Sequence, residues 1–141
     1  MDNEDIEIKF VDSWPEDEIV MLYKAGGWWK ESYDKSAIQS MSTGSFAFAV
    51  VVLSKSSKAI GMGRILSDGV SDAYIQDLVV LPKYRGQGIG KKLVNFLISH
   101  CLSKGIVWIG LIAEPGNDKF YKDLGLKPMK DHIPMLYQKE R

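Results

Sequence analysis

Four features are scarce or missing in this chain of 141 residues, and each argues against a class of protein. A single cysteine, Cys101, rules out an intrachain disulfide and lends no support to an oxidising compartment. Basic and acidic residues balance at 18 each, whereas nucleic-acid-binding domains normally carry a basic excess. The apolar runs are well short of the roughly 18 residues of a spanning helix, and the acidic start, Met1–Asp5, is unlike a secretory signal. We therefore expect a cytoplasmic protein that binds neither nucleic acid nor membrane.

The chain is long enough for one domain, 1–141, with a sizeable core, because 45% of its residues are hydrophobic. Alternation, cap residues and turn signals predict where its strands and helices lie. Strands are expected at 6–10, 46–53, 59–66, 73–81, 107–113 and 135–138. Helices are expected at about 15–24, 34–41, 88–104 and 117–125. This order predicts an α/β fold, with helices on both faces of a mixed sheet and a parallel crossover from 73–81 to 107–113.

A glycine-rich turn joins the strand at 73–81 to the helix at 88–104 and reads PKYRGQGIGKK up to Lys92. A strand, a glycine turn and a helix start bring unpaired backbone N–H groups together, which favours an anion such as phosphate. The turn is not a P-loop, because Arg85 stands where the first glycine belongs. It also lacks the third glycine of the dinucleotide motif, whose place is taken by Lys91 or Leu93. A helix entry without a ligand is the alternative interpretation.

Two motifs point to a known family. Arg85-x-x-Gly88-x-Gly90 resembles the Arg/Gln-x-x-Gly-x-Gly/Ala signature of the GNAT acetyltransferases, and its flanks resemble that family's strand, turn and helix. Residues 117–126, NDKFYKDLGL, resemble the family's segment in which an Asn precedes Phe-Tyr-x-x-x-Gly-Phe, with Leu126 in place of the commoner phenylalanine. The resemblance implies the GNAT fold, with splayed parallel strands at the cofactor slot, and acetyl-CoA as the co-substrate of an N-acetyltransferase.

The resemblance also implies which residues bind the cofactor. Backbone groups of the strand would pair with the pantetheine arm of coenzyme A, and one N–H group would face the acetyl oxygen. N–H groups of the glycine turn would hold the pyrophosphate, with charge added by Arg85. Asn117 would hydrogen-bond the pantetheine, cap its helix, or do both. The complete set is Leu78, Val79, Val80, Arg85, Gly86, Gln87, Gly88, Ile89, Gly90, Lys91 and Asn117. No metal site is expected.

Two residues are candidates for catalysis. Tyr121 aligns with the tyrosine that many GNAT members use as general acid toward the departing thiolate, and the alternative is that it only packs beside Phe120. Asp77 is the best candidate for a general base, because an acid inside a buried strand is costly without a purpose. A structural acceptor role for Asp77, with water as the proton path, is the alternative. Gln76 is expected on the opposite face of the strand.

The acceptor pocket of this superfamily is built largely from the first helix, loop and second helix. Here the loop carries Trp28, Trp29 and Glu31. Two adjacent tryptophans cannot easily both face the core, so we expect at least one to be partly exposed or to line a cavity. Aromatic faces suit an aromatic or apolar primary amine, and Glu31 could attract its ammonium group. The alternative is that the tryptophans cover the sheet or form the contact of a homodimer.

The segments GRILSDGVSDAYIQDLVV and FYKDLGL resemble the small-amine branch of the superfamily, which includes aralkylamine and glucosamine-phosphate acetyltransferases. We therefore predict transfer of an acetyl group to a small amine. Two other functions stay open. One is a sensor that binds acyl-CoA without catalysis, and the other is a protein N-acetyltransferase.

Overall fold

The computed structural model describes residues 5–139 and divides the chain into two compact units, 1–111 and 112–141. The first unit holds one five-stranded sheet in the order β1-β2-β3-β4-β5. Neighbouring strands are antiparallel from β1 to β4, whereas β4 and β5 are parallel, which confirms the predicted mixed α/β sheet. The strands are β1 (Ile6–Phe10), β2 (Ala47–Leu53), β3 (Ala59–Ser67), β4 (Asp72–Val80) and β5 (Trp108–Gly110).

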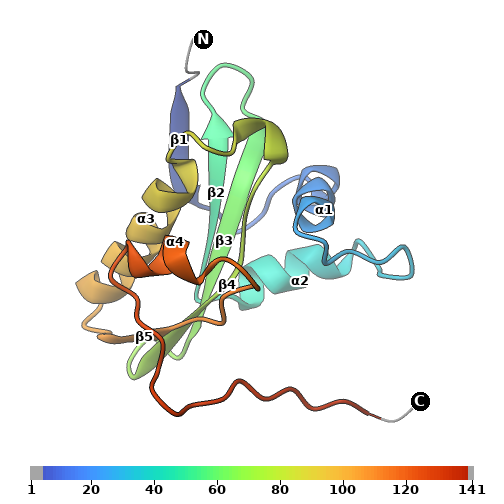
Figure 1. Ribbon diagram of the computed structural model, residues 1–141. Helices are drawn as coiled ribbons and strands as arrows, with labels where there is room; N and C mark the ends of the chain where they lie inside the picture. The colour runs from blue at the N-terminus through green and yellow to red at the C-terminus, as the bar shows by residue number, and fades with distance from the viewer. Residues whose placement is uncertain (1–4, 140–141) are drawn as a thin grey trace. The chain divides into compact units, whose positions relative to one another are not determined.

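Helices cover both faces of this sheet, as Figure 1 shows for the first unit. Helix α3 (Ile89–Ser103) buries Leu93 and Leu97 against one face, and we call this layer the α3 core. Helices α1 (Glu16–Ala25) and α2 (Ala37–Gly44) pack on the other face, the α1 core, where Ile19 and Leu22 are fully buried. Because β2 lies between the two layers, all seven of its residues are buried.

The pairing of β4 with β5 is short. It joins only Asp72–Tyr74 to Trp108–Gly110. Beyond Tyr74, the β5 side of β4 has no partner strand within the described part of the first unit. The strand predicted at 107–113 is therefore reduced to the three residues of β5, because its pairing with β4 ends at Gly110. The result is the open strand edge, Ile75–Val80, expected for splayed parallel strands.

The second unit contains helix α4 (Asp118–Lys122) and extended or turn segments. The strand predicted at 135–138 is wrong, because these residues form no ladder. Met135, Leu136 and Tyr137 are 82–90% exposed, and an apolar run becomes a strand only when its backbone groups find a pairing partner. No helix among the described residues is long and apolar enough to cross a bilayer.

Candidate active site

The glycine turn follows β4 and a short 3₁₀ helix, η1 (Pro82–Tyr84). Gly86 has a φ of 78° and Gly88 a φ of 81°, a backbone conformation that side chains strain. A Cβ added to either glycine would meet no atom within 4 Å. Glycine is therefore favoured at both positions by the positive φ of the backbone, and not by crowding. The space beside the loop is open to a ligand.

The start of α3 offers donors to such a ligand. Among the N–H groups that begin α3, that of Lys92 is the first with a backbone partner, the Gly88 carbonyl at 3.2 Å. The amides of Ile89–Lys91 therefore precede the helical ladder. The first turn holds no acid, although acids are favoured there by the helix dipole. It holds instead the exposed Lys91 and Lys92, and cations at a helix N-terminus are unfavourable unless an anion compensates them. These features fit a pyrophosphate.

Arg85 links the turn to two other elements. Its Nε donates to the Val80 carbonyl at 2.8 Å, and its Nη2 donates to the Ala25 carbonyl at 3.4 Å. The guanidinium thus fixes the end of β4 against the end of α1. Its predicted contact with phosphate stays a prediction.

A β-bulge interrupts β4 within its open edge. Met62 faces Val79 and Arg64 faces Gln76, so Gly63 alone stands opposite two residues of β4, Asp77 and Leu78. Asp77 has a φ of 57°, and a left-handed conformation at a residue other than glycine costs about 1–3 kcal/mol.

The bulge reverses which residues of β4 face each layer. Ala73 and Ile75 pack in the α3 core before the bulge, whereas Leu78 and Val80 pack there after it. Val79 then contributes to the α1 core. The expectation that Gln76 and Asp77 point to opposite faces is therefore wrong, because both reach the same arginine.

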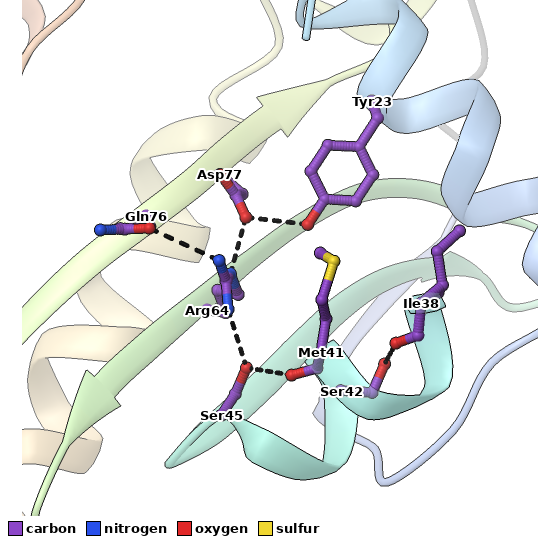
Figure 2. A network of polar contacts seen from close by, with 8 residues as sticks. All are labelled: Tyr23, Ile38, Met41, Ser42, Ser45, Arg64, Gln76 and Asp77. Carbon is purple, nitrogen blue, oxygen red and sulfur yellow. Dashed lines mark hydrogen bonds and ion pairs between the residues drawn. The ribbon is translucent and has the colours of Figure 1, made fainter. Parts of the chain in front are cut away.

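That arginine is Arg64, the centre of the polar network in Figure 2. Its Nε donates to Asp77 Oδ2 at 2.6 Å, while Nη2 lies 3.5 Å from Gln76 Oε1 and Nη1 3.5 Å from Ser45 Oγ. Tyr23, on α1, donates its hydroxyl to the same Oδ2 at 2.8 Å. The Arg64 and Asp77 side chains are only 16% and 22% exposed, so this ion pair is largely shielded from solvent.

Burial and the neighbouring Asp77 carboxylate raise the pKa of Tyr23 far above its ordinary value. The hydroxyl therefore stays protonated and acts as a donor. Asp77 accepts both of its hydrogen bonds through one oxygen, which supports the structural-acceptor interpretation of this residue. Its role as a general base stays a prediction.

An aromatic cluster surrounds Tyr23. The ring of Trp28 lies 6.2 Å from that of Tyr23 and covers Gly26, where an added Cβ would come within 2.5 Å of it. Trp29 packs edge-on against Tyr33 at 5.4 Å. Both tryptophans are partly buried against the α1 core, which agrees with the expected partial exposure.

The contact that Glu31 makes is with Lys24 and not with the aromatic cluster. It forms an ion pair with Lys24 at 3.6 Å, and its side chain is 87% exposed. A salt bridge in solvent contributes little to stability, so this ion pair gives no support to a role of Glu31 beside the aromatic rings.

In the second unit, Asn117 precedes α4 but makes no side-chain hydrogen bond to cap it. The interpretation of Asn117 as a helix cap is therefore not supported. Its contact with the pantetheine stays a prediction. Tyr121 is half-buried and packs edge-on against Phe120 at 5.0 Å. Burial, with the charge of Glu114, raises the pKa of Tyr121 above its ordinary value, which keeps a proton available for donation.

Sequence reasoning missed the roles of Arg64 and Tyr23. One signal was present, since Arg64 is the only charged residue in the strand Ala59–Ser67. A second signal was the spacing of apolar residues in β4, which changes from Ala73 and Ile75 to Leu78 and Val80. A step of three in place of two indicates a bulge.

The family model of the GNAT acetyltransferases matches residues 9–126, which include the bulge, the glycine turn and Tyr121. The chain belongs to the GNAT acetyltransferase family. It is 32% identical over 120 residues to the uncharacterized N-acetyltransferase ycf52 of Pyropia yezoensis, covering 85% of this chain and 69% of that protein.

Two further proteins are similar to this chain. Histone acetyltransferase TAP1 of Glycine max is 38% identical over 80 residues, which are 57% of this chain, and the chain spans only 35% of its length. A GNAT family acetyltransferase structure from Streptococcus pneumoniae superposes with a TM-score of 0.79 at 25% identity, covering 96% of this chain and 99% of that one. The fold is therefore that of the family, whereas the plant protein is much longer than this chain.

Proposed function

We propose that the chain transfers the acetyl group of acetyl-CoA to a primary amine by direct attack. The observation that carries this proposal is the start of α3, where left-handed Gly86 and Gly88 leave helix amides and two lysines open to an anion. On the β5 side of the strand that leads to it, Ile75–Val80 have no partner strand within the described part of the first unit. A pyrophosphate needs the first feature, and the amide-bearing pantetheine arm needs the second.

The residues divide the work as follows. Amides across Gly86–Lys91 bind the pyrophosphate, and the backbone of Leu78–Val80 pairs with the pantetheine as an added strand. One amide of that edge polarises the acetyl carbonyl, which is stabilisation of the oxyanion type. Arg85 keeps the edge in place through the Val80 carbonyl and adds positive charge near the phosphates. Asn117 hydrogen-bonds the pantetheine.

Proton transfer is assigned to two residues. Tyr121 donates a proton to the departing thiolate, and its raised pKa keeps that proton bound at neutral pH. Asp77 is the candidate for removing the amine proton. Both of its hydrogen bonds reach Oδ2, which leaves Oδ1 without a partner among the described residues.

The proposed acceptor is a primary amine with an aromatic or apolar body. The partly buried rings of Trp28 and Trp29, which pack around Tyr23, support this choice, since indole faces attract aromatic and cationic groups. Glu31 contributes only a general attraction for the ammonium group, because it pairs with Lys24 in solvent. A cytoplasmic location, a homodimer and a single domain over 1–141 remain part of the proposal.

A protein amine is the second candidate acceptor, because the Glycine max relative is named a histone acetyltransferase. The test is a thiol-release assay with acetyl-CoA against 2-phenylethylamine, glucosamine 6-phosphate and a lysine-bearing histone-tail peptide. The highest kcat/KM for phenylethylamine supports the proposal, and the highest for the peptide replaces it by protein acetylation. Binding of acetyl-CoA in calorimetry without turnover on any amine would show a sensor.

A further inference from the structure

The bulge of β4 depends on a residue held in an unfavourable conformation. Three residues other than glycine have a positive φ in the described part of the chain, namely Ser57, Asp77 and Asp131. Of these, Asp77 alone lies within a strand. A strand offers no local turn that would favour this conformation, so contacts from elsewhere must hold it.

Those contacts come from two different elements and meet at one atom. Arg64 reaches Asp77 Oδ2 from β3, and Tyr23 reaches the same oxygen from α1. Arg64 is itself braced by Ser45 Oγ, which in turn donates to the Met41 carbonyl of α2 at 2.6 Å. Figure 2 shows the carboxylate of Asp77 between the tyrosine and the arginine.

We propose that Arg64 and Tyr23 are positioning residues, which hold Asp77 in its left-handed conformation and so maintain the bulge that presents Leu78–Val80 to acetyl-CoA. This inference rests on the proposed function. It assigns the ion pair an indirect task in cofactor binding, because both donors act on the Asp77 carboxylate.

Register explains why the bulge matters for binding. Successive side chains of a strand alternate between its faces, so loss of one extra residue exchanges the faces of every residue beyond it. Without the bulge, Leu78 and Val80 would leave the α3 core and Val79 would leave the α1 core. The amides and carbonyls at the open edge would change direction with them.

The carboxylate can be separated from the backbone conformation, because glycine adopts a positive φ without any clamp. We therefore compare Arg64→Met, Tyr23→Phe, Asp77→Val and the double variant Arg64→Met/Asp77→Gly. Lys35→Met is the control, since it removes an exposed ion pair of the same unit, with Asp17. Calorimetry measures the Kd for acetyl-CoA, and thermal unfolding shows that each variant is folded.

We expect Arg64→Met and Asp77→Val to raise the Kd by about tenfold or more, and Tyr23→Phe to raise it less. The double variant should return to within about threefold of the wild-type chain, because its glycine restores the bulge without the ion pair. Lys35→Met should bind normally. Wild-type affinity in Arg64→Met, or a double variant as weak as the single one, would overturn the inference.

The same titrations separate this inference from the proposed function. If the wild-type chain does not bind acetyl-CoA, both fail; if it binds and Arg64→Met binds equally well, only the positioning role fails. Arg64→Lys is the conservative variant, since a lysine keeps the positive charge but lacks the forked donors of the guanidinium. Its Kd is expected to lie between those of the wild-type chain and Arg64→Met. Turnover by the double variant then decides whether Asp77 also takes the amine proton.

Discussion

Leu78 fills the space that a side chain on Gly63 would need. A Cβ added to Gly63 would lie 2.8 Å from Leu78 Cδ1 and 3.0 Å from Leu97 Cδ1. The bulge brings Leu78 over Gly63, so glycine on β3 and the extra residue on β4 belong to one packing arrangement. The close approach allows α3 to pack directly on the sheet at this point.

Gly63→Ala should therefore lower the free energy of unfolding by about 1–3 kcal/mol, the usual cost of overpacking a core. Gly44→Ala is the control, because a Cβ there meets no atom within 4 Å and no unusual φ is involved. It should be neutral or stabilise by about 0.4–1 kcal/mol. Urea unfolding measures both, and equal stabilities would show that the bulge can move away from an alanine.

Tyr23 should make stability depend on alkaline pH. Its folded-state pKa is raised, so below about pH 10 both the folded and the unfolded chain keep the proton and its hydrogen bond contributes fully. Above about pH 10 the unfolded chain loses that proton first, which lowers the free energy of unfolding. Tyr23→Phe should cost about 1.5–3 kcal/mol at pH 8, and this cost should shrink at higher pH.

Denaturant titrations at pH 8 and at about pH 11 would measure the difference. Tyr137→Phe provides the control, since Tyr137 is 89% exposed. A Tyr23→Phe variant whose loss of stability is the same at both pH values would contradict the assigned titration.

Gly88→Glu should abolish or strongly weaken acetyl-CoA binding. The substitution forces a side chain into a left-handed position and puts negative charge where a pyrophosphate is expected. Gly105→Glu is the matched control, because Gly105 has a φ of 79° and open space but lies after the other end of α3. Calorimetry should show normal affinity for the control only. Equal affinities in both variants would remove the anion site from the assignment.

Tyr121→Phe should lower kcat by about 10²-fold, the usual scale for loss of a general acid. The KM for acetyl-CoA should hardly change, since the ring can still pack against Phe120. Because the pKa of Tyr121 is raised, its deprotonation should not reduce the wild-type rate below about pH 10. Steady-state kinetics across pH would test both points, and wild-type turnover in the variant would make Tyr121 structural only.

Local signals in the sequence predict most of the fold. The helix predicted at 88–104 is observed at Ile89–Ser103, because a glycine turn and Gly105 mark its two ends. The prediction of a strand at 135–138 was wrong, because an apolar run does not by itself indicate a pairing partner. The helix expected at 34–41 lies at Ala37–Gly44, since Asp34 accepts a hydrogen bond from the Ser36 amide in a turn that precedes it.

The site was predictable only where it follows from the backbone. A glycine in a turn indicates a possible positive φ from the sequence alone, as at Gly86 and Gly88. The partners of Asp77, in contrast, lie 13 residues (Arg64) and 54 residues (Tyr23) away along the chain. Arg64 and Tyr23 become its neighbours only through the pairing of β3 with β4 and the packing of α1 on the sheet. A buried acid in a strand indicates that a partner exists, but it does not identify that partner.

The acceptor proposal predicts that the tryptophans of the first loop decide amine selectivity. Trp29 and Tyr33 make an edge-on pair whose tyrosine is 47% exposed, while the ring of Trp28 covers Gly26. Trp29→Ala should raise the KM for an aromatic amine by roughly 5- to 150-fold, which corresponds to about 1–3 kcal/mol of lost burial and stacking. Trp28→Ala should have a larger effect on the melting temperature, because its ring packs against backbone and Tyr23.

Both single variants are assayed with phenylethylamine and with a small aliphatic amine, and the KM for acetyl-CoA is measured in parallel. Loss of the preference for the aromatic amine, with an unchanged acetyl-CoA KM, supports a pocket lined by indole, since the predicted cofactor site lies on β4 and α3. Variants that melt earlier but keep their amine selectivity would place both tryptophans in the core or in a subunit contact. The aromatic-amine proposal would then lose the only residues that support it, and the lysine peptide would become the acceptor to pursue.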